Sequence, residues 1–148
     1  MATVISSTPR EGEEVSRDQR ELVNSYTSAI SDGDFDLLAE LIHPNATFGG
    51  TVMSEVSGVE AFVQGFRNLR PITLRTTVRE TIIENGRAAV LYDLVTDTAV
   101  GPVLCAEFLE LEEDKILSST LLFDWRRWPE VLTEIRSRAL APRPEAAT

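Results

Sequence analysis

Apolar residues in the first half of the chain recur at helical spacing. One stripe consists of Leu22, Val23, Tyr26, Ala29 and Ile30. This spacing predicts a helix that begins with Ser16 as its N-cap and ends at the turn Asp32-Gly33-Asp34. A second helix, capped by Asp34, is expected over residues 35–42, and Pro44 follows its end.

The segment after residue 45 predicts two short strands and a third helix. Residues 46–48 and 51–56 are the strand candidates, separated by Gly49-Gly50. Ser57-Gly58-Val59-Glu60 has the S-x-x-E pattern of a capping box, which is typical of a helix start. We therefore expect the third helix to begin there and to end before Pro71.

From residue 72 onward the hydrophobic period changes to the alternation of strands. Four long strands are expected over residues 72–83, 88–97, 103–111 and 116–123. Asn85-Gly86 predicts a tight hairpin turn, and Asp124 is expected to cap a last helix that ends near Arg138. The pattern predicts an α+β fold: a cone-shaped, curved antiparallel sheet wrapped around three N-terminal helices, with a short C-terminal helix.

The length of 148 residues suits one domain with a hydrophobic core, which we place at residues 16–139. Residues 1–15 are polar and without periodicity, so we expect a flexible N-terminal arm. Residues 140–148 are expected to form a disordered tail.

Composition and charge exclude several classes of function. The net charge of −10 argues against nucleic acid or an anionic membrane as a partner. One Cys and one His exclude an internal disulfide and the usual zinc motifs, and no P-loop or G-x-G-x-x-G occurs. We expect no metal and no cofactor. Because no long apolar segment occurs, we also expect a soluble, cytoplasmic protein.

The residue with the clearest chemical consequence is Glu107. Strand alternation places it on the same face as Val103, Cys105, Leu109 and Leu111. A charged, dry and unpaired carboxylate on a core face would cost many kcal/mol, so Glu107 must protonate, find a partner or line a wet cavity. A register shift that places Glu107 in solvent or against Arg75 or Arg79 is the alternative.

Four segments resemble the nuclear transport factor 2-like superfamily, which includes ketosteroid isomerase, polyketide cyclases and SnoaL-like domains. They are Tyr26-x6-Gly33-Asp34, His43-Pro44-Asn45-Ala46-Thr47-Phe48, Ser57-Gly58-x-Glu60 and Leu121-Leu122-Phe123-Asp124, within residues 17–132. The resemblance implies the cone-shaped fold. Proteins with this fold have many unrelated activities, so the function has to be inferred from the residues of the site.

The resemblance to ketosteroid isomerase implies roles for two residues. Tyr26 and Glu107 match the positions of a tyrosine and a protonated carboxylic acid that together stabilise an oxyanion. The chain departs from that enzyme at Gly50, which stands where its general base lies. It departs from limonene epoxide hydrolase at Leu121, in place of an Asp, and from scytalone dehydratase in having only His43.

The candidate catalytic residues are Glu107, Tyr26 and His43. Tyr26 could equally be a core tyrosine, and His43 could simply interact with the end of a helix. Asp93 is expected to face outward, and Cys105 to be a small buried hydrophobe. The predicted pocket is lined by Phe48, Phe62, Phe66, Tyr92, Cys105, Leu109, Leu121 and Phe123.

These features favour a cofactor-independent enzyme that acts by acid–base chemistry on a small apolar molecule with a carbonyl or hydroxyl group. A cyclase, isomerase or dehydratase is expected first, and an epoxide hydrolase last. The alternative is a module of the same fold that binds a small ligand or dimerises without catalysis. We also expect a homodimer through an outer sheet face that carries Thr73, Thr77, Thr81, Leu104, Ala106 and Phe108.

Overall fold

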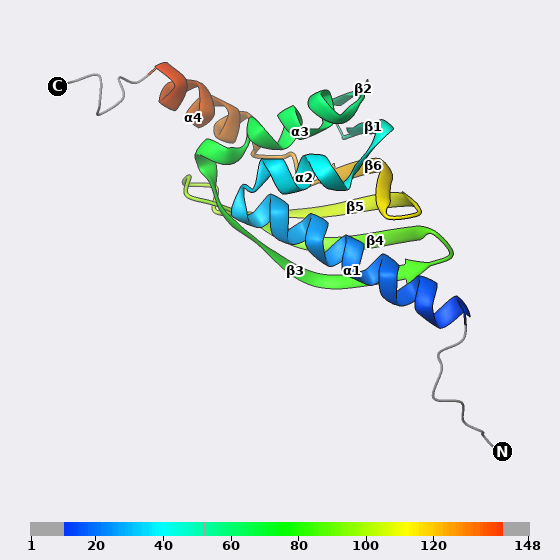
Figure 1. Cartoon of the computed structure of the whole chain (residues 1–148). Coiled ribbons are helices and arrows are strands. Elements are labelled where there is room, and N and C mark those ends of the chain that lie inside the picture. The colour runs from blue at the N-terminus through cyan, green and yellow to red at the C-terminus, as the bar shows by residue number, and fades with distance from the viewer. Residues whose placement is uncertain (1–10, 52, 141–148) are drawn as a thin grey trace.

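The computed structural model describes residues 11–51 and 53–140, with side chains described from residue 18 onward (Figure 1). The first half contains α1 (Glu11–Asp32), α2 (Phe35–Leu41), β1 (Ile42–Gly50), β2 (Met53–Ser57), α3 (Val59–Arg67) and the 3-10 helix η1 (Arg70–Ile72). The second half contains β3 (Thr73–Glu84), β4 (Arg87–Thr96), β5 (Pro102–Glu112), β6 (Lys115–Phe123) and α4 (Trp128–Leu140).

The strands form one six-stranded sheet in the order β2-β1-β6-β5-β4-β3. Neighbouring strands are antiparallel except β1 and β6, which are parallel. Helices α1, α2 and α3 lie on one face of this curved sheet, and α4 lies at one end (Figure 1). The α+β prediction is therefore confirmed, with one parallel pair inside a mostly antiparallel sheet.

The turns follow the local chemistry that the sequence indicates. Asn85 and Gly86 both have positive φ, 48° and 76°, which is the geometry expected of a tight hairpin. Asp34 caps α2, since its Oδ1 accepts a hydrogen bond of 3.1 Å from the backbone N–H of Leu37.

The prediction of which side chains of β3 face the core is wrong over part of the strand. The register with β4 shifts between Thr73 and Arg75 and again between Val78 and Glu80. Each irregularity inserts a residue without a partner and reverses the alternation of side chains. As a result Thr81 lies opposite the buried Val90 on the inner face, and Thr73 also faces inward. Only Thr77 of the three predicted threonines lies opposite an outer residue, Asp93.

The outer position predicted for Asp93 is confirmed. Its carboxylate accepts two hydrogen bonds from the guanidinium of Arg79, at 2.8 and 3.0 Å. This pair involves Asp93 and not Glu107, so the alternative in which Glu107 meets Arg79 is wrong.

Three predicted helix starts are also wrong. Helix α1 begins at Glu11, so it overlaps the predicted arm; residues 1–10 and 141–148 lie outside the described residues. The N-cap of α3 is Gly58, because Ser57 still pairs with Thr47 in the β1–β2 ladder and only a glycine readily adopts φ 94°.

Asp124 lies too far from α4 to cap it. Its carboxylate instead accepts hydrogen bonds from the backbone and guanidinium of Arg126, which lower the pKa of Asp124 to about 2. Helix α4 is tied to the body of the protein at its other end. There Arg138 donates to the carbonyl of Pro71 and forms an ion pair with Asp97, both at 2.7 Å.

The core lies between the inner face of the sheet and α1, α2 and α3. Aromatic rings from β1 and α3 stack within it, with ring centroids 4.8 Å apart for Phe48–Phe62 and 5.1 Å apart for Phe48–Phe66. No helix of the described residues is long and apolar enough to cross a membrane.

Gly50 is expected to be essential for the contact between β1 and β6. A Cβ atom at this position would lie 1.8 Å from the carbonyl oxygen of Leu121. Gly50→Ala should therefore lower the unfolding free energy by about 3–5 kcal/mol, measured by urea denaturation.

Gly101→Ala is the matched control, because Gly101 also has positive φ but nothing lies within 4 Å of a Cβ atom there. Gly101→Ala should lower the unfolding free energy by only about 1–2 kcal/mol, which is the penalty for a non-glycine residue in the left-handed conformation. Equal losses in the two variants would contradict the steric explanation.

Candidate active site

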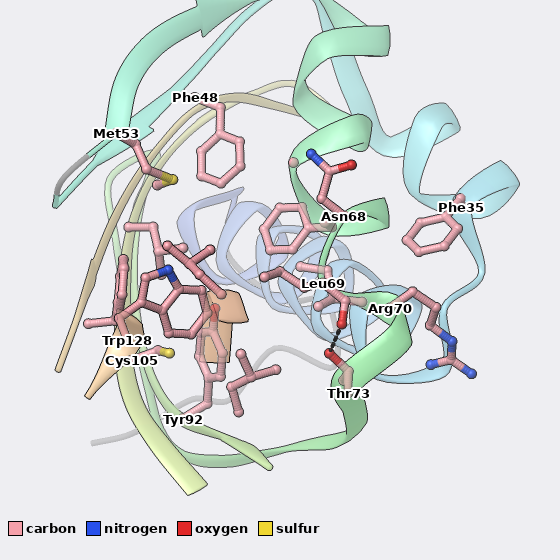
Figure 2. A pocket seen from close by; sticks show the side chains of 17 residues that line it. Phe35, Phe48, Met53, Asn68, Leu69, Arg70, Thr73, Tyr92, Cys105 and Trp128 are labelled. Atoms are coloured by element: carbon pink, nitrogen blue, oxygen red, sulfur yellow. Dashed lines mark hydrogen bonds between the residues drawn. The ribbon is translucent and has the colours of Figure 1, made fainter. Parts of the chain in front are cut away.

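A cavity of about 440 Å³ opens between the sheet, α3, η1 and α4. This volume lies within the roughly 300–1,000 Å³ typical of small-molecule sites. Its lining is mostly apolar and consists of Ile30, Phe35, Phe48, Met53, Gly65, Phe66, Asn68, Leu69, Arg70, Thr73, Tyr92, Leu94, Cys105, Leu121, Phe123, Trp128 and Leu132. Figure 2 shows Tyr92, Cys105 and Trp128 together on one side of it, with Leu69 and Thr73 opposite.

Six of the eight predicted lining residues border the cavity: Phe48, Phe66, Tyr92, Cys105, Leu121 and Phe123. The prediction is wrong for Phe62 and Leu109, which are buried in the core instead. Phe62 stacks against Phe48, and Leu109 follows Glu107 on the same buried face of β5.

Glu107 is 1% exposed and accepts hydrogen bonds from three hydroxyl groups. Tyr26 of α1 donates to Oε1 at 2.6 Å, and Ser119 of β6 donates to the same oxygen at 2.7 Å. Tyr92 of β4 donates to Oε2 at 2.7 Å. The predicted inward position of Glu107 and its contact with Tyr26 are thus confirmed, and each carboxyl oxygen has a partner.

Burial determines the ionisation of this cluster. It raises the pKa of Glu107 above its ordinary value, although the hydroxyls of Tyr26, Tyr92 and Ser119 act in the opposite direction by stabilising the carboxylate. Burial and the nearby charge of Glu107 raise the pKa values of Tyr26 and Tyr92 well above normal. Both phenols therefore remain protonated and act as hydrogen-bond donors.

Tyr92 links the buried cluster to the cavity. It is the one member of the cluster among the lining residues, because Tyr26, Glu107 and Ser119 lie behind the cavity wall. A ligand in the cavity can therefore contact Tyr92 directly, whereas Glu107 acts on the ligand only through Tyr92.

His43 does not belong to this site. It lies in β1, not at the end of a helix, and its Nδ1 accepts a hydrogen bond of 3.0 Å from the backbone N–H of Asn45. It is absent from the cavity lining, so the structure does not bring it together with the Glu107 cluster at the cavity.

The other candidate positions do not supply a base either. Gly50 has no space for a side chain. Burial raises the pKa of the Cys105 thiol to about 12, so this residue remains protonated. The guanidinium of Arg70 points away from the cavity in Figure 2.

Sequence reasoning missed Ser119 and the contribution of α4. Ser119 shares a strand face with Leu121, so the register between β5 and β6 could have found it. Trp128 and Leu132 border the cavity only because α4 folds over its end, a contact for which the sequence carries no local signal.

The SnoaL-like domain model matches residues 23–119, more than half of the chain. The chain belongs to the SnoaL-like domain family. This confirms the resemblance to the nuclear transport factor 2-like superfamily that the sequence motifs indicated. No curated protein matches the chain.

Solved structures of the same fold include two proteins from Kribbella flavida and one from Sinorhizobium meliloti. One Kribbella protein is 19% identical with a TM-score of 0.70 and covers 79% of this chain and 95% of its own. The other, named as a candidate ketosteroid isomerase, is 14% identical with a TM-score of 0.66 and covers 74% and 79%. The Sinorhizobium protein, named as a candidate polyketide cyclase, is 20% identical with a TM-score of 0.64 and covers 72% and 98%. At these identities the likeness concerns the fold.

The raised pKa of Glu107 predicts a pH-dependent stability. Folded protein holds this proton at pH values where the unfolded chain, with a pKa of about 4.3, has lost it. The stability from this group is therefore complete below about pH 4 and is lost, by about 1.4 kcal/mol per pH unit, as pH rises toward the folded-state pKa. Glu107→Gln should remove this loss in urea denaturation across pH, whereas parallel curves for both proteins would contradict a raised pKa.

Replacing Glu107 by an apolar residue should have a different result. Glu107→Leu leaves the hydroxyls of Tyr26, Tyr92 and Ser119 without their acceptor, and each unsatisfied buried group costs about 1–3 kcal/mol. We expect Glu107→Leu to be at least about 2 kcal/mol less stable than Glu107→Gln at the same pH. A Leu variant as stable as the Gln variant would show that these hydroxyls find other acceptors.

Proposed function

We propose that this protein is a cofactor-independent enzyme of the isomerase, cyclase or dehydratase type. Its substrate is a small, mainly apolar molecule with a carbonyl or hydroxyl group, bound in the cavity beside Tyr92. The observation that carries this proposal is the single polar connection from an apolar cavity to a buried acid: Tyr92 lines the cavity and its hydroxyl lies 2.7 Å from Glu107 Oε2.

Such an arrangement supports stabilisation of developing negative charge. When Glu107 is neutral and does not accept the single O–H of Tyr92, this phenol, held in place beside an apolar cavity, can donate to an enolate or alkoxide oxygen without having to reorient water. The role that the family resemblance implied for Tyr26 and Glu107 is thereby transferred to Tyr92. Tyr26, Glu107 and Ser119 act behind it as positioning residues.

The proton that leaves carbon requires a different acceptor. The ionisable groups in the described lining are Tyr92, Cys105 and Arg70, and none of them is a base at neutral pH. Water or a basic group of the substrate itself must accept the proton. Substrates with an acidic C–H bond next to a carbonyl suit this site best, and dehydration that starts by hydrogen bonding to a leaving hydroxyl is the next candidate.

A second function is favoured by the same lack of a side-chain base. The cavity would then bind its ligand without changing it, and Tyr92 would fix the orientation of the ligand oxygen. Both functions require the same complex, so binding and turnover have to be measured separately.

The test compares Tyr92→Phe with Tyr26→Phe, the only two tyrosines of the chain. A panel of small β,γ-unsaturated ketones and 1,3-diketones is screened for binding by NMR and for turnover by ultraviolet absorbance. If the protein is an enzyme, Tyr92→Phe should lower kcat by about 10²–10³ with a smaller change in KM, because it removes a donor to the transition state. Tyr26→Phe, which removes a hydroxyl remote from the ligand, should have a smaller effect.

The outcomes separate the two functions. A ketone that binds beside Tyr92 and is recovered unchanged supports the binding module. Turnover that survives Tyr92→Phe at full rate contradicts the catalytic role of Tyr92. Absence of binding by the whole panel contradicts both functions.

We also propose that two copies of the chain associate through the outer face of the sheet. Large apolar side chains are exposed there on four adjacent strands: Ile82, Leu91, Leu104, Phe108 and Leu122. Ile82 lies in line with Phe108 through Ala89, and Leu91 with Leu122 through Ala106, so these side chains are contiguous. A second copy would cover this surface with the same residues, as in a two-fold symmetric dimer.

Phe108→Glu combined with Leu104→Glu should convert the dimer to a monomer, because both substitutions place charge in the centre of this surface. Light scattering at micromolar concentration measures the mass. Leu140→Glu, at an exposed position of α4, is the control and should leave the mass unchanged. A wild-type protein of monomer mass would refute the dimer.

A further inference from the structure

The two oxygens of Glu107 are not equivalent. Oε1 accepts hydrogen bonds from both Tyr26 and Ser119, whereas Oε2 accepts only from Tyr92. A carboxyl oxygen has about two acceptor sites, so Oε1 is fully used. When Glu107 is neutral, its proton therefore belongs on Oε2, where it points to the hydroxyl oxygen of Tyr92.

This asymmetry determines what Tyr92 offers to a ligand. A hydroxyl has one proton to donate and lone pairs to accept with, and it rotates to suit its partners. While Glu107 is ionised, Tyr92 gives its proton to Oε2 and has only lone pairs left for the cavity. Once Glu107 is neutral and donates to the hydroxyl oxygen of Tyr92, the O–H bond of Tyr92 is free to turn toward the cavity.

Among the groups of this buried cluster, Glu107 is the one whose charge changes with pH. The groups that face it are Tyr26 from α1, Tyr92 from β4, Cys105 from β5 and Ser119 from β6. The phenols and the thiol remain protonated, and Ser119 does not titrate. The ion pairs of the described residues all involve other carboxylates.

We propose that the protonation of Glu107 selects the ligand: the neutral form turns Tyr92 into a donor for a carbonyl oxygen, and the ionised form turns it into an acceptor for a hydroxyl. Above the pH at which Glu107 ionises, a carbonyl ligand therefore binds together with one proton from solvent, which ends on Oε2. A hydroxyl ligand binds without this proton. No bond of the ligand changes in this step, and the inference rests on the contact with Tyr92 in the proposed function.

The experiment uses two probes with one carbon skeleton, 1-tetralone and 1-tetralol. Their affinities are measured by isothermal titration calorimetry from about pH 5 to pH 9, in buffers of different ionisation enthalpy. Tetralone affinity should fall by about tenfold per pH unit above the pKa of Glu107 in the free protein, with uptake of about one proton. Tetralol affinity should stay level or rise over the same range.

Three variants distinguish this switch from a general loss of structure. Glu107→Gln keeps a donor toward Tyr92, so tetralone binding should lose its pH dependence. Tyr92→Phe should lower the limiting tetralone affinity at low pH and also abolish the pH dependence. Tyr26→Phe removes one donor to the carboxylate, so it should move the midpoint of the pH dependence to higher pH.

The results distinguish a failure of the inference alone from a failure of the proposed binding site. If both probes show the same pH dependence, or if Tyr92→Phe weakens both equally, the proton-linked selection is wrong while the binding site stands. If neither probe binds at its solubility limit, the apolar site and the inference fail together.

Discussion

The central constraint in this structure is the buried carboxyl group of Glu107. A carboxyl group at 1% exposure needs partners for its oxygens, and they come from α1, β4 and β6. Glu107 itself belongs to β5. One acidic side chain thereby links the first helix to three adjacent strands.

This cluster also marks where the solid core ends and the cavity begins. On one side of Glu107, Leu109 is buried in the hydrophobic core. On the other side, Cys105 borders the cavity, to which α3, η1 and α4 also contribute lining residues. Tyr92 lies at the boundary, since it lines the cavity and its hydroxyl donates to the acid.

The fold alone does not determine the chemistry, because the same cone carries many activities. The position at which the resemblance to ketosteroid isomerase implied a general base is Gly50, whose backbone lies against Leu121, and Nδ1 of His43 accepts a hydrogen bond from the backbone of Asn45. The site is consequently one-sided: it is well equipped to hydrogen-bond an oxygen and poorly equipped to remove a proton from carbon.

The sequence by itself determined the elements whose signals are local. Strand alternation placed Glu107 on the inner face, the Asn85-Gly86 pair located the hairpin, and the motifs around Tyr26 identified the fold. Only the tertiary structure decided the inner face of β3, the contact of Ser119 with Glu107 and the closure of the cavity by α4. Irregularities in β3 cancel the period of two, and the other two contacts join segments far apart in the chain, so no spacing of neighbouring residues predicts them.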